Sequence, residues 1–150
     1  MPLPPSLARR PQAAHPLRIL YADDFRELRE FMSVMLARQG HLIETVADGS
    51  SALEWLQRAG AAIDLLITDH NMHEGMDGLE LVRRVRESTF AGKIVVFTSE
   101  LSETVLDQYH GLGVDLILPK TTFPVALRRM LDDLFNPTAL PGADEVAPVI

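Results

Sequence analysis

Five short apolar runs recur along the middle of the chain, and each is followed by a segment of different periodicity. The runs are built mainly from leucine, isoleucine and valine, and several of them are unbroken rather than alternating with polar residues. Unbroken runs of this length are typical of strands that are covered on both faces. They span residues 19–22, 42–46, 63–68, 94–98 and 114–118. A sheet of buried parallel strands is therefore the expected framework of the fold.

The segments between and after the runs show helical spacing of their apolar residues. The stripe of the first segment comprises Leu28, Phe31, Met32, Met35 and Leu36. The stripe of the last segment comprises Leu127, Met130, Leu131 and Leu134, with Pro124 where a first helical turn is expected. Because strands and helices alternate five times, the sequence predicts an α/β fold, a doubly wound five-stranded parallel sheet with helices on both faces.

The ends of the chain differ in composition from its middle. Residues 1–16 are rich in proline and lack periodicity, and residues 136–150 carry three prolines and a glycine. We therefore expect one domain over residues 17–135 between a flexible leader and a flexible tail. A tail of fifteen residues is too short to form a DNA-binding module or an enzyme domain, so output by protein binding is the expectation.

Composition excludes several classes of function. The formal net charge is −7, which argues against a nucleic-acid-binding surface. The chain has no cysteine, so disulfides, thiolate metal sites and thiol catalysis are excluded. No apolar run approaches the roughly 18 residues of a membrane span, and the leader lacks the apolar core of a signal peptide. These features predict a cytoplasmic protein.

Polar residues whose side chains can bind ligands or react follow four of the five runs. Because the carboxyl ends of parallel strands meet at one edge of a sheet, these residues should converge there. They are Asp23 and Asp24 after the first run, Asp69 and Asn71 after the third, Thr98 and Ser99 at the end of the fourth, and Lys120 after the fifth.

Three carboxylates at one edge repel one another unless a cation lies between them. Mg²⁺ takes oxygen ligands at such a site and leaves positions for phosphoryl oxygens, with Mn²⁺ as the alternative ion. Lys120 can neutralise further charge, and the Thr98 hydroxyl can bind a phosphoryl oxygen. Asp69, at the centre of the sheet, is then the natural nucleophile for phosphoryl transfer.

Structural roles are the alternative at each of these positions. Asp23 and Asp24 could simply cap the first helix, and Thr98 and Ser99 could cap the fourth. Lys120 taken alone could be a solvated turn residue. Two histidines near the third run, His70 and His73, are expected to be exposed loop residues rather than metal ligands, and His41 is expected to be a surface or connector residue.

Five motifs in order resemble the receiver domain of two-component response regulators. They are ADD at 22–24, TDHNM at 68–72, MDG at 76–78, FTS at 97–99 and the turn that carries Lys120. The resemblance covers about residues 17–135. It implies the flavodoxin-like strand order 2-1-3-4-5.

The resemblance also implies a role for each matching residue. Asp69 would accept a phosphoryl group from a histidine kinase or a histidine phosphotransfer protein. Asp23, Asp24, Asp69 and the backbone carbonyl of Asn71 would hold Mg²⁺. Lys120 would pair with the phosphoryl group, Thr98 would turn toward it, and Ser99 would provide the small side chain beside it. The chain would then be a phosphoacceptor rather than an enzyme for an external substrate, acting on a downstream protein or through a homodimer.

Three departures from the family pattern bear on the mechanism. The loop after Asp69 has His73 where the family has proline, and it has one additional residue before Met76. Ile117 stands at the position of the family's switch aromatic. Pro119 precedes Lys120, whereas the family has proline after the lysine. In receivers, the side chains two positions after the acceptor aspartate and two positions after the threonine tune dephosphorylation. Here they are Asn71 and Glu100, both polar, so the resemblance implies a short-lived phosphoryl group.

Other functions remain as alternatives. A degenerate receiver could serve as an unphosphorylated scaffold, which Ile117 and the altered loop favour and the retained acids oppose. A phosphatase with an aspartate nucleophile would need a second acid where Asn71 stands. A flavodoxin-like cofactor carrier would need a phosphate-binding loop where residues 23–28 read DDFREL.

Overall fold

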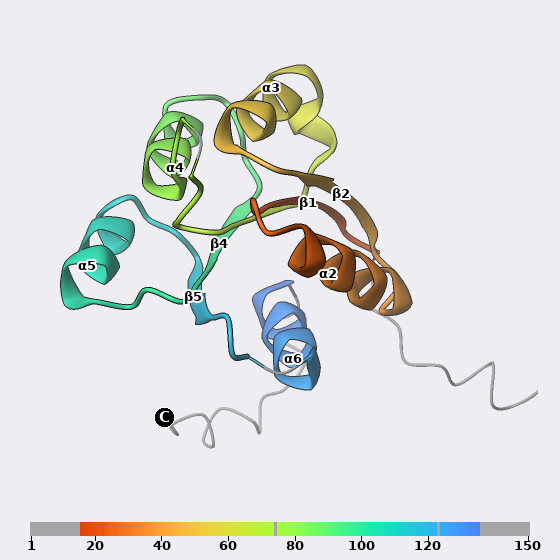
Figure 1. Ribbon diagram of the computed structural model, residues 1–150. Coiled ribbons are helices and arrows are strands. Elements are labelled where there is room, and N and C mark those ends of the chain that lie inside the picture. The colour runs from red at the N-terminus through yellow and green to blue at the C-terminus, as the bar shows by residue number, and fades with distance from the viewer. Residues whose placement is uncertain (1–15, 74, 123, 136–150) are drawn as a thin grey trace, which may run out of the picture.

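The computed structural model describes residues 16–73, 75–122 and 124–135. Strands and helices alternate along this part of the chain (Figure 1). The strands are β1 (Arg18–Ala22), β2 (Leu42–Val46), β3 (Leu65–Thr68), β4 (Lys93–Thr98) and β5 (Leu116–Pro119). The helices are α2 (Arg26–Arg38), α3 (Gly49–Ala59), α4 (Gly78–Arg86), α5 (Glu103–Gly111) and α6 (Pro124–Phe135), with a short 3-10 helix, η1 (Gly60–Ala62). The predicted tail and all but the last residue of the predicted leader lie outside the described residues.

The five strands form one parallel sheet in the order β2-β1-β3-β4-β5. The expected α/β fold with order 2-1-3-4-5 is therefore confirmed. The chain runs outward from β1 to β2 and then returns to place β3 on the other side of β1. This reversal puts the loops after β1 and β3 side by side, which is where open parallel sheets bind their ligands.

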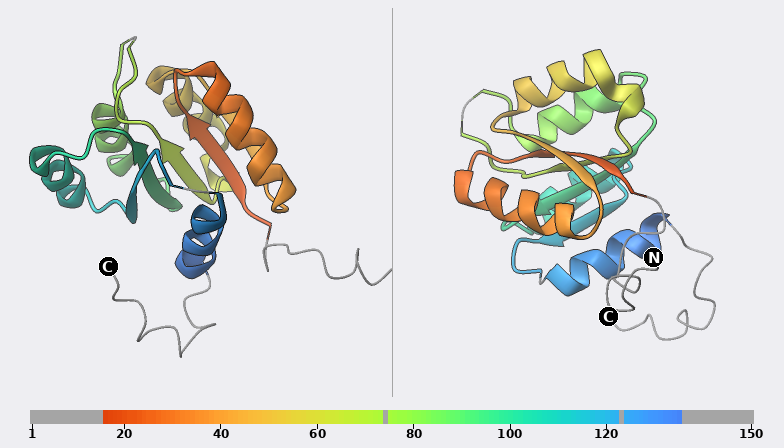
Figure 2. Two further views of the ribbon diagram at one scale, coloured as in Figure 1. Left: turned by 60° about the horizontal axis from the view of Figure 1, so that its bottom comes forward. Right: turned by 90° about the vertical axis from the view of Figure 1, so that its right-hand side faces the viewer.

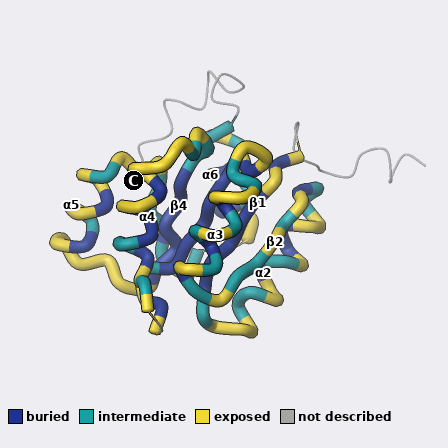
Figure 3. Tube along the Cα trace, turned by 90° about the horizontal axis from the view of Figure 1, so that it is seen from above, coloured by how far each residue is buried: buried dark blue, intermediate teal, exposed yellow. Residues whose placement is uncertain are grey.

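Helices cover both faces of the sheet (Figures 1 and 2). On one face, α2 and α6 pack through a cluster that includes Met32, Leu36, Leu127 and Leu131. On the other face, α3, α4 and α5 contribute to a second cluster, which includes Leu56, Leu81, Val82 and Tyr109. The three central strands, β1, β3 and β4, are the most deeply buried part of the molecule (Figure 3), whereas β2 and β5 at the edges are only partly buried. Burial on both faces explains why the central runs are unbroken in apolar residues.

Several expectations at the edges of elements are wrong. Phe31 is 51% exposed and Met130 is 37% exposed, because both lie on the outer border of their helical stripes. The third strand begins at Leu65 rather than residue 63, since the N–H of Ile63 closes the turn on the carbonyl of Gly60. The fifth strand likewise begins two residues later than expected. Pro124 is the first residue of α6, as its fixed φ predicts.

His41 is a buried residue, contrary to expectation. Its side chain joins the start of the sheet, because its Nδ1 accepts a hydrogen bond of 3.0 Å from the backbone N–H of Leu17. Burial lowers the pKa of His41 below its ordinary value. The imidazole is therefore kept neutral, as an acceptor must be.

No helix among the described residues is both long enough and apolar enough to cross a bilayer.

Candidate functional site

Three carboxylates gather where β1 and β3 end. The strand register pairs Ala22 with Thr68, and the N–H of Asp69 bonds to the carbonyl of Ala22 at 2.9 Å. The acids that follow the two strands are therefore level with each other. One carboxylate oxygen from each of Asp23, Asp24 and Asp69 lies within 4.8 Å of the other two. Three acid oxygens at this spacing are the hard donor set that Mg²⁺ or Mn²⁺ takes, so these residues fit a divalent ion.

Asp23 is fully buried and its carboxylate accepts three hydrogen bonds. Its Oδ2 accepts from the Tyr21 hydroxyl at 2.7 Å and from Lys120 Nζ at 2.9 Å. Its Oδ1 accepts from the backbone N–H of Phe25 at 2.9 Å. Charge-assisted bonds of this kind offset the cost of keeping the carboxylate away from water. The capping alternative is wrong for this pair, because the N-cap position of α2 is Phe25.

Lys120 joins the ends of the first and third strands electrostatically. Its Nζ lies 2.9 Å from Asp23 Oδ2 and 3.1 Å from Asp69 Oδ2, so one cation is shared by two buried acids. Burial by itself would lower the pKa of Lys120, but the bonds to Asp23 and then Asp69 outweigh it and raise that pKa. Lys120 is thus held in its charged form. The peptide bond before Pro119 is trans, and the reach of the lysine is retained.

Asp69 is 3% exposed at the end of β3. Burial raises the pKa of its carboxyl group, and the charge of Asp23 raises it further. Lys120 and the backbone N–H of Asn71 act in the opposite direction. An acid that burial and a like charge both oppose gains from any further positive charge, which is the electrostatic basis for binding a cation here.

The Thr98 hydroxyl is buried and lies at the end of β4. It accepts a hydrogen bond of 3.0 Å from the backbone N–H of Glu100. The Glu100 side chain in turn accepts from Asn71 Nδ2 at 3.3 Å, so the loops after β3 and β4 are joined. Ser99 is exposed beside Thr98. Neither residue caps the next helix, because the N-cap of α5 is Ser102.

The altered loop after Asp69 is anchored at two points. Met72 is 5% exposed and packs in the core below the loop. The backbone N–H of His73 donates to Asp24 Oδ2 at 3.0 Å, a bond that proline at this position could not make. Gly75 has φ +69°, so the residue added to this loop is accommodated by a left-handed turn.

His70 is not an exposed loop residue, contrary to expectation. Its side chain is 12% exposed, and its Nδ1 lies 2.7 Å from the Tyr109 hydroxyl on α5. The two rings meet edge to face, with centroids 5.5 Å apart. His73, by contrast, is exposed as expected.

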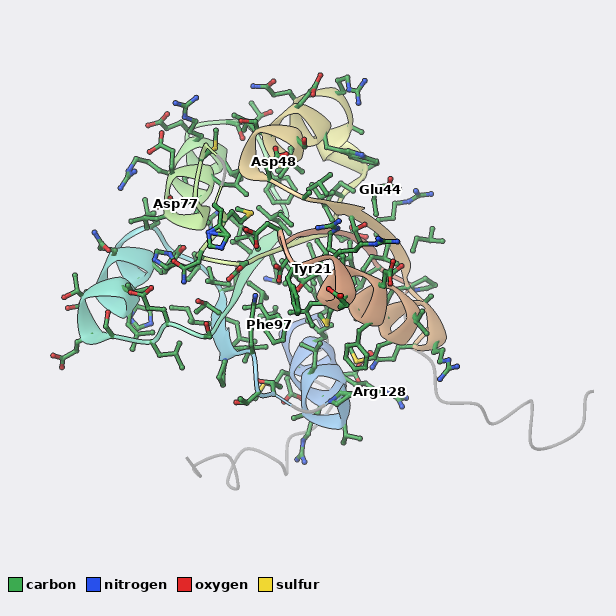
Figure 4. All side chains as sticks on the ribbon, in the orientation of Figure 1. Tyr21, Glu44, Asp48, Asp77, Phe97 and Arg128 are labelled. Carbon is green, nitrogen blue, oxygen red and sulfur yellow. The ribbon has the colours of Figure 1, made fainter. Side chains whose placement is uncertain are left out.

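Sequence reasoning missed two residues that shape the site. Tyr21 donates to Asp23, and its one signal was a hydroxyl within an otherwise apolar strand. Figure 4 shows Tyr21 and Phe97 on the face of the sheet that α2 and α6 cover, and both residues belong to the core cluster beneath these two helices. Gly78 begins α4 beside Asp69, and an added Cβ there would lie 2.1 Å from the Asp69 carbonyl oxygen. The MDG motif contained this glycine without revealing what it approaches.

Comparison with known proteins places this geometry in context. The family model of the response regulator receiver domain matches residues 19–132. The transcriptional regulatory protein TctD of Salmonella typhimurium is 36% identical over 106 residues, which are 69% of this chain and 45% of that protein. The response regulator MprA of Mycobacterium ulcerans is 36% identical over 117 residues, 77% of this chain and 47% of that protein. The chain thus spans about half the length of the curated relatives it matches.

A solved structure agrees with these relatives. The chemotaxis protein CheY4 of Vibrio cholerae superposes with a TM-score of 0.73 at 30% sequence identity. The match covers 80% of this chain and 99% of that chain. Sequence and fold therefore lead to the same family.

Proposed function

The chain belongs to the response regulator receiver domain family, and from this premise we propose that Asp69 accepts a phosphoryl group while Asp23 and Asp24 help to hold Mg²⁺. Phosphorylation and Mg²⁺ binding in an acidic pocket are general to this family. The observation that carries the proposal is the cluster of three carboxylate oxygens within 4.8 Å, with Lys120 bonded to two of the acids.

The proposed reaction is a transfer between two carriers. A carboxylate oxygen of Asp69 forms a bond to phosphorus as the bond between phosphorus and its donor breaks, and the donor leaves with that electron pair. The donor is a phosphohistidine of a kinase or of a histidine phosphotransfer protein, or a small acyl phosphate. The chemistry that Mg²⁺ supplies when bound is charge neutralisation at the phosphoryl oxygens.

The other residues of the site assist by charge and hydrogen bonding. Lys120 would turn from Asp69 to the phosphoryl group, since both are anionic and adjacent. The Thr98 hydroxyl would donate to a phosphoryl oxygen, and the small side chain of Ser99 would leave room for the group. The backbone carbonyl of Asn71 would complete the protein ligands of the ion.

Turnover of the phosphoryl group is proposed to be fast. Asn71 and Glu100 contact each other at 3.3 Å, and both present polar atoms that can orient water. We expect the phosphorylated form to decay within minutes in Mg²⁺ buffer. A lifetime of hours would contradict this role for the pair.

Output is proposed to be protein binding by a cytoplasmic response regulator. A phosphorylation-dependent surface would bind a downstream protein or a second copy of the chain. The net charge of −7 supports a protein rather than a nucleic acid as the partner. Pull-down with a phosphorylated and an unphosphorylated bait tests the dependence on phosphate.

A second candidate is a degenerate receiver that acts as an unphosphorylated scaffold. The observation in its favour is Ile117, which is half-buried and aliphatic where the family has its switch aromatic. The shared lysine and the acid cluster count against it, because a scaffold has no need to bury two carboxylates at one point. A phosphatase is less favoured, since the exposed amide of Asn71 cannot act as the general acid.

Acetyl phosphate with Mg²⁺ tests the phosphoacceptor directly. Intact mass should increase by one phosphoryl group, and the increase should be absent in EDTA and in the Asp69→Asn variant. Asp133→Asn, which neutralises an exposed acid on α6, is the matched control and should be phosphorylated like the wild type. If the wild type gains no mass, or if Asp69→Asn gains it equally, Asp69 is not the acceptor.

A further inference from the structure

Helix α5 buries two of its own side chains in the domain. Of its residues, Val105 and Tyr109 are buried, with 6% and 0% exposure. The rest of the helix faces solvent or is half-buried. Arg86 on α4 holds the C-terminal end of α5, by donating to the carbonyls of Leu112 and Gly113. Because only two side chains of α5 itself are buried, a change in the surroundings of Tyr109 is expected to alter the position or stability of the helix.

Tyr109 is linked to the acceptor aspartate by one hydrogen bond and one peptide bond. Its hydroxyl lies 2.7 Å from Nδ1 of His70, which directly follows Asp69 in the chain. The edge-to-face contact of the two rings, with planes at 81°, fixes the imidazole against α5. A displacement of the backbone at Asp69 therefore reaches α5 without passing through another strand.

Either atom of this hydrogen bond can be the donor, and the position of Glu100 favours donation by the tyrosine. Burial raises the pKa of Tyr109, so its hydroxyl stays protonated and can donate to His70. When the hydroxyl donates, the proton of a neutral imidazole lies on Nε2. That nitrogen is 3.9 Å from Glu100 Oε1, so the carboxylate faces the positive end of the ring.

Glu100 connects the same imidazole to Thr98. Its backbone N–H donates to the Thr98 hydroxyl at 3.0 Å, and its side chain accepts from Asn71. If the Thr98 hydroxyl turns toward a phosphoryl group, the N–H of Glu100 loses its acceptor and the residue is free to shift. The anion that faces His70 then moves as well. Asp69, through the backbone, and Thr98, through Glu100, can thus both change the surroundings of His70.

We propose that His70 and Tyr109 are positioning residues that transmit phosphorylation of Asp69 to α5, by weakening the hydrogen bond between them. This inference rests on the proposed phosphoacceptor function. It gives the chain a hydrogen-bonded route to α5 that does not depend on Ile117, whose aliphatic side chain cannot make a hydrogen bond. The phosphoryl group would shift the equilibrium between two states of this contact, one with the hydrogen bond formed and one with it weakened.

A purely structural role for the pair makes a different prediction. If the hydrogen bond only stabilises the core, its loss should loosen α5 by the same amount with and without phosphate. If the bond transmits the signal, its loss should remove the difference between the two forms. The phosphorylation-dependent difference is therefore the quantity to measure.

Hydrogen exchange followed by mass spectrometry measures this difference in peptides that cover residues 101–113. The variants are Tyr109→Phe, which keeps the ring and removes the hydroxyl, and His70→Gln. His110→Gln is the matched control, because it makes the same change at an exposed position on α5. Each protein is compared with and without acetyl phosphate and Mg²⁺, and intact mass reports the phosphorylated fraction.

In the wild type, phosphorylation should speed exchange in α5 by about three- to tenfold, the factor expected for weakening one hydrogen bond. Tyr109→Phe and His70→Gln should gain the same mass, exchange faster before phosphorylation, and show no further increase. His110→Gln should behave like the wild type. A full phosphorylation response in Tyr109→Phe overturns the inference, as does a phosphorylated wild type whose α5 is unchanged. A wild type that gains no mass refutes the proposed function itself, and this inference with it.

Discussion

Replacing Gly78 by alanine tests how closely the acceptor strand and α4 are fitted together. A Cβ at this position would lie 2.1 Å from the Asp69 carbonyl oxygen and 2.8 Å from the Cα of His70. Both atoms belong to the backbone, so no side chain can rotate away. The N–H of Gly78 also donates to the His70 carbonyl at 2.9 Å, which holds the two segments at this spacing.

The size of the effect follows from the distance that must be gained. Ordinary contact with a Cβ begins at 3.4 Å, so the segments must separate by about 1.3 Å. The first turn of α4 cannot yield easily, because Leu81 and Val82 are fully buried and Asp77 caps the helix by accepting from the N–H of Glu80. Overpacking costs about 1–3 kcal/mol, and a clash between backbone segments lies at the upper end of that range. We expect a loss of about 3 kcal/mol in the free energy of unfolding and about 10 °C in Tm.

The substitution should also reduce the rate of phosphorylation, in addition to its effect on stability. A displacement of Asp69 by a substantial fraction of an ångström misplaces the nucleophile, which should slow phosphorylation by about tenfold or more. The assay is thermal unfolding together with the rate of mass gain in acetyl phosphate and Mg²⁺, at a temperature where the variant is folded. Gly111→Ala is the matched control, since no atom lies within 4 Å of its added Cβ, and it should change the free energy of unfolding by less than about 1 kcal/mol. If Gly78→Ala has the Tm and rate of Gly111→Ala, the close approach does not position the acceptor.

Three further predictions concern buried groups. Tyr21→Phe removes one donor from buried Asp23 and should lower the free energy of unfolding by about 1.5–3 kcal/mol in urea titrations, whereas an unchanged midpoint would show that the bond is unimportant. Lys120→Met leaves Asp23 and Asp69 without their shared cation and should lower the free energy of unfolding by about 3 kcal/mol in EDTA. Part of this loss should be recovered when Mg²⁺ is added, and a loss that Mg²⁺ leaves unchanged would contradict this. Because the pKa of His41 is lowered in the folded protein, its contribution to the free energy of unfolding is complete above the ordinary pKa of 6.5. That contribution is lost as the pH falls from 6.5 toward the folded-state pKa. Tm should therefore fall more steeply from pH 7.5 to 5.5 in the wild type than in His41→Asn, and parallel slopes would contradict this.

The sequence was sufficient to predict the sheet and the acids because both depend on local patterns. An unbroken apolar run ends where the strand leaves the core, and the first polar residue after it must lie at the edge of the sheet. Asp23 and Asp69 are placed by this rule alone, once β1 and β3 are neighbours. The order of the strands itself came from the resemblance to the family, since periodicity does not specify which strands are adjacent.

Residues whose role depends on a neighbour distant in sequence were predicted poorly. Phe31 fits the helical stripe of α2 but lies at its border, where exposure depends on the neighbouring helix. Tyr21 and Gly78 act through single close approaches that no periodicity encodes. His70 was expected in solvent because its neighbours in the loop are polar, yet its partner Tyr109 is 39 residues away.

The balance of charge at the site links the predicted acids to the proposed chemistry. Asp23, Asp24 and Asp69 contribute three negative charges when ionised, and Lys120 contributes one positive charge, which leaves a net charge of about −2 in a largely buried cluster. Burial and the charge of Asp23 raise the pKa of Asp69, so a further cation would favour the ionised form of the cluster. A divalent ion would remove that imbalance. The lysine could then leave the acids for an incoming phosphoryl group, because the ion would replace it as their partner. The lysine that Asp23 and Asp69 share is therefore the group best placed to respond when phosphate arrives, and Lys120→Met should impair phosphorylation even where Mg²⁺ restores the fold.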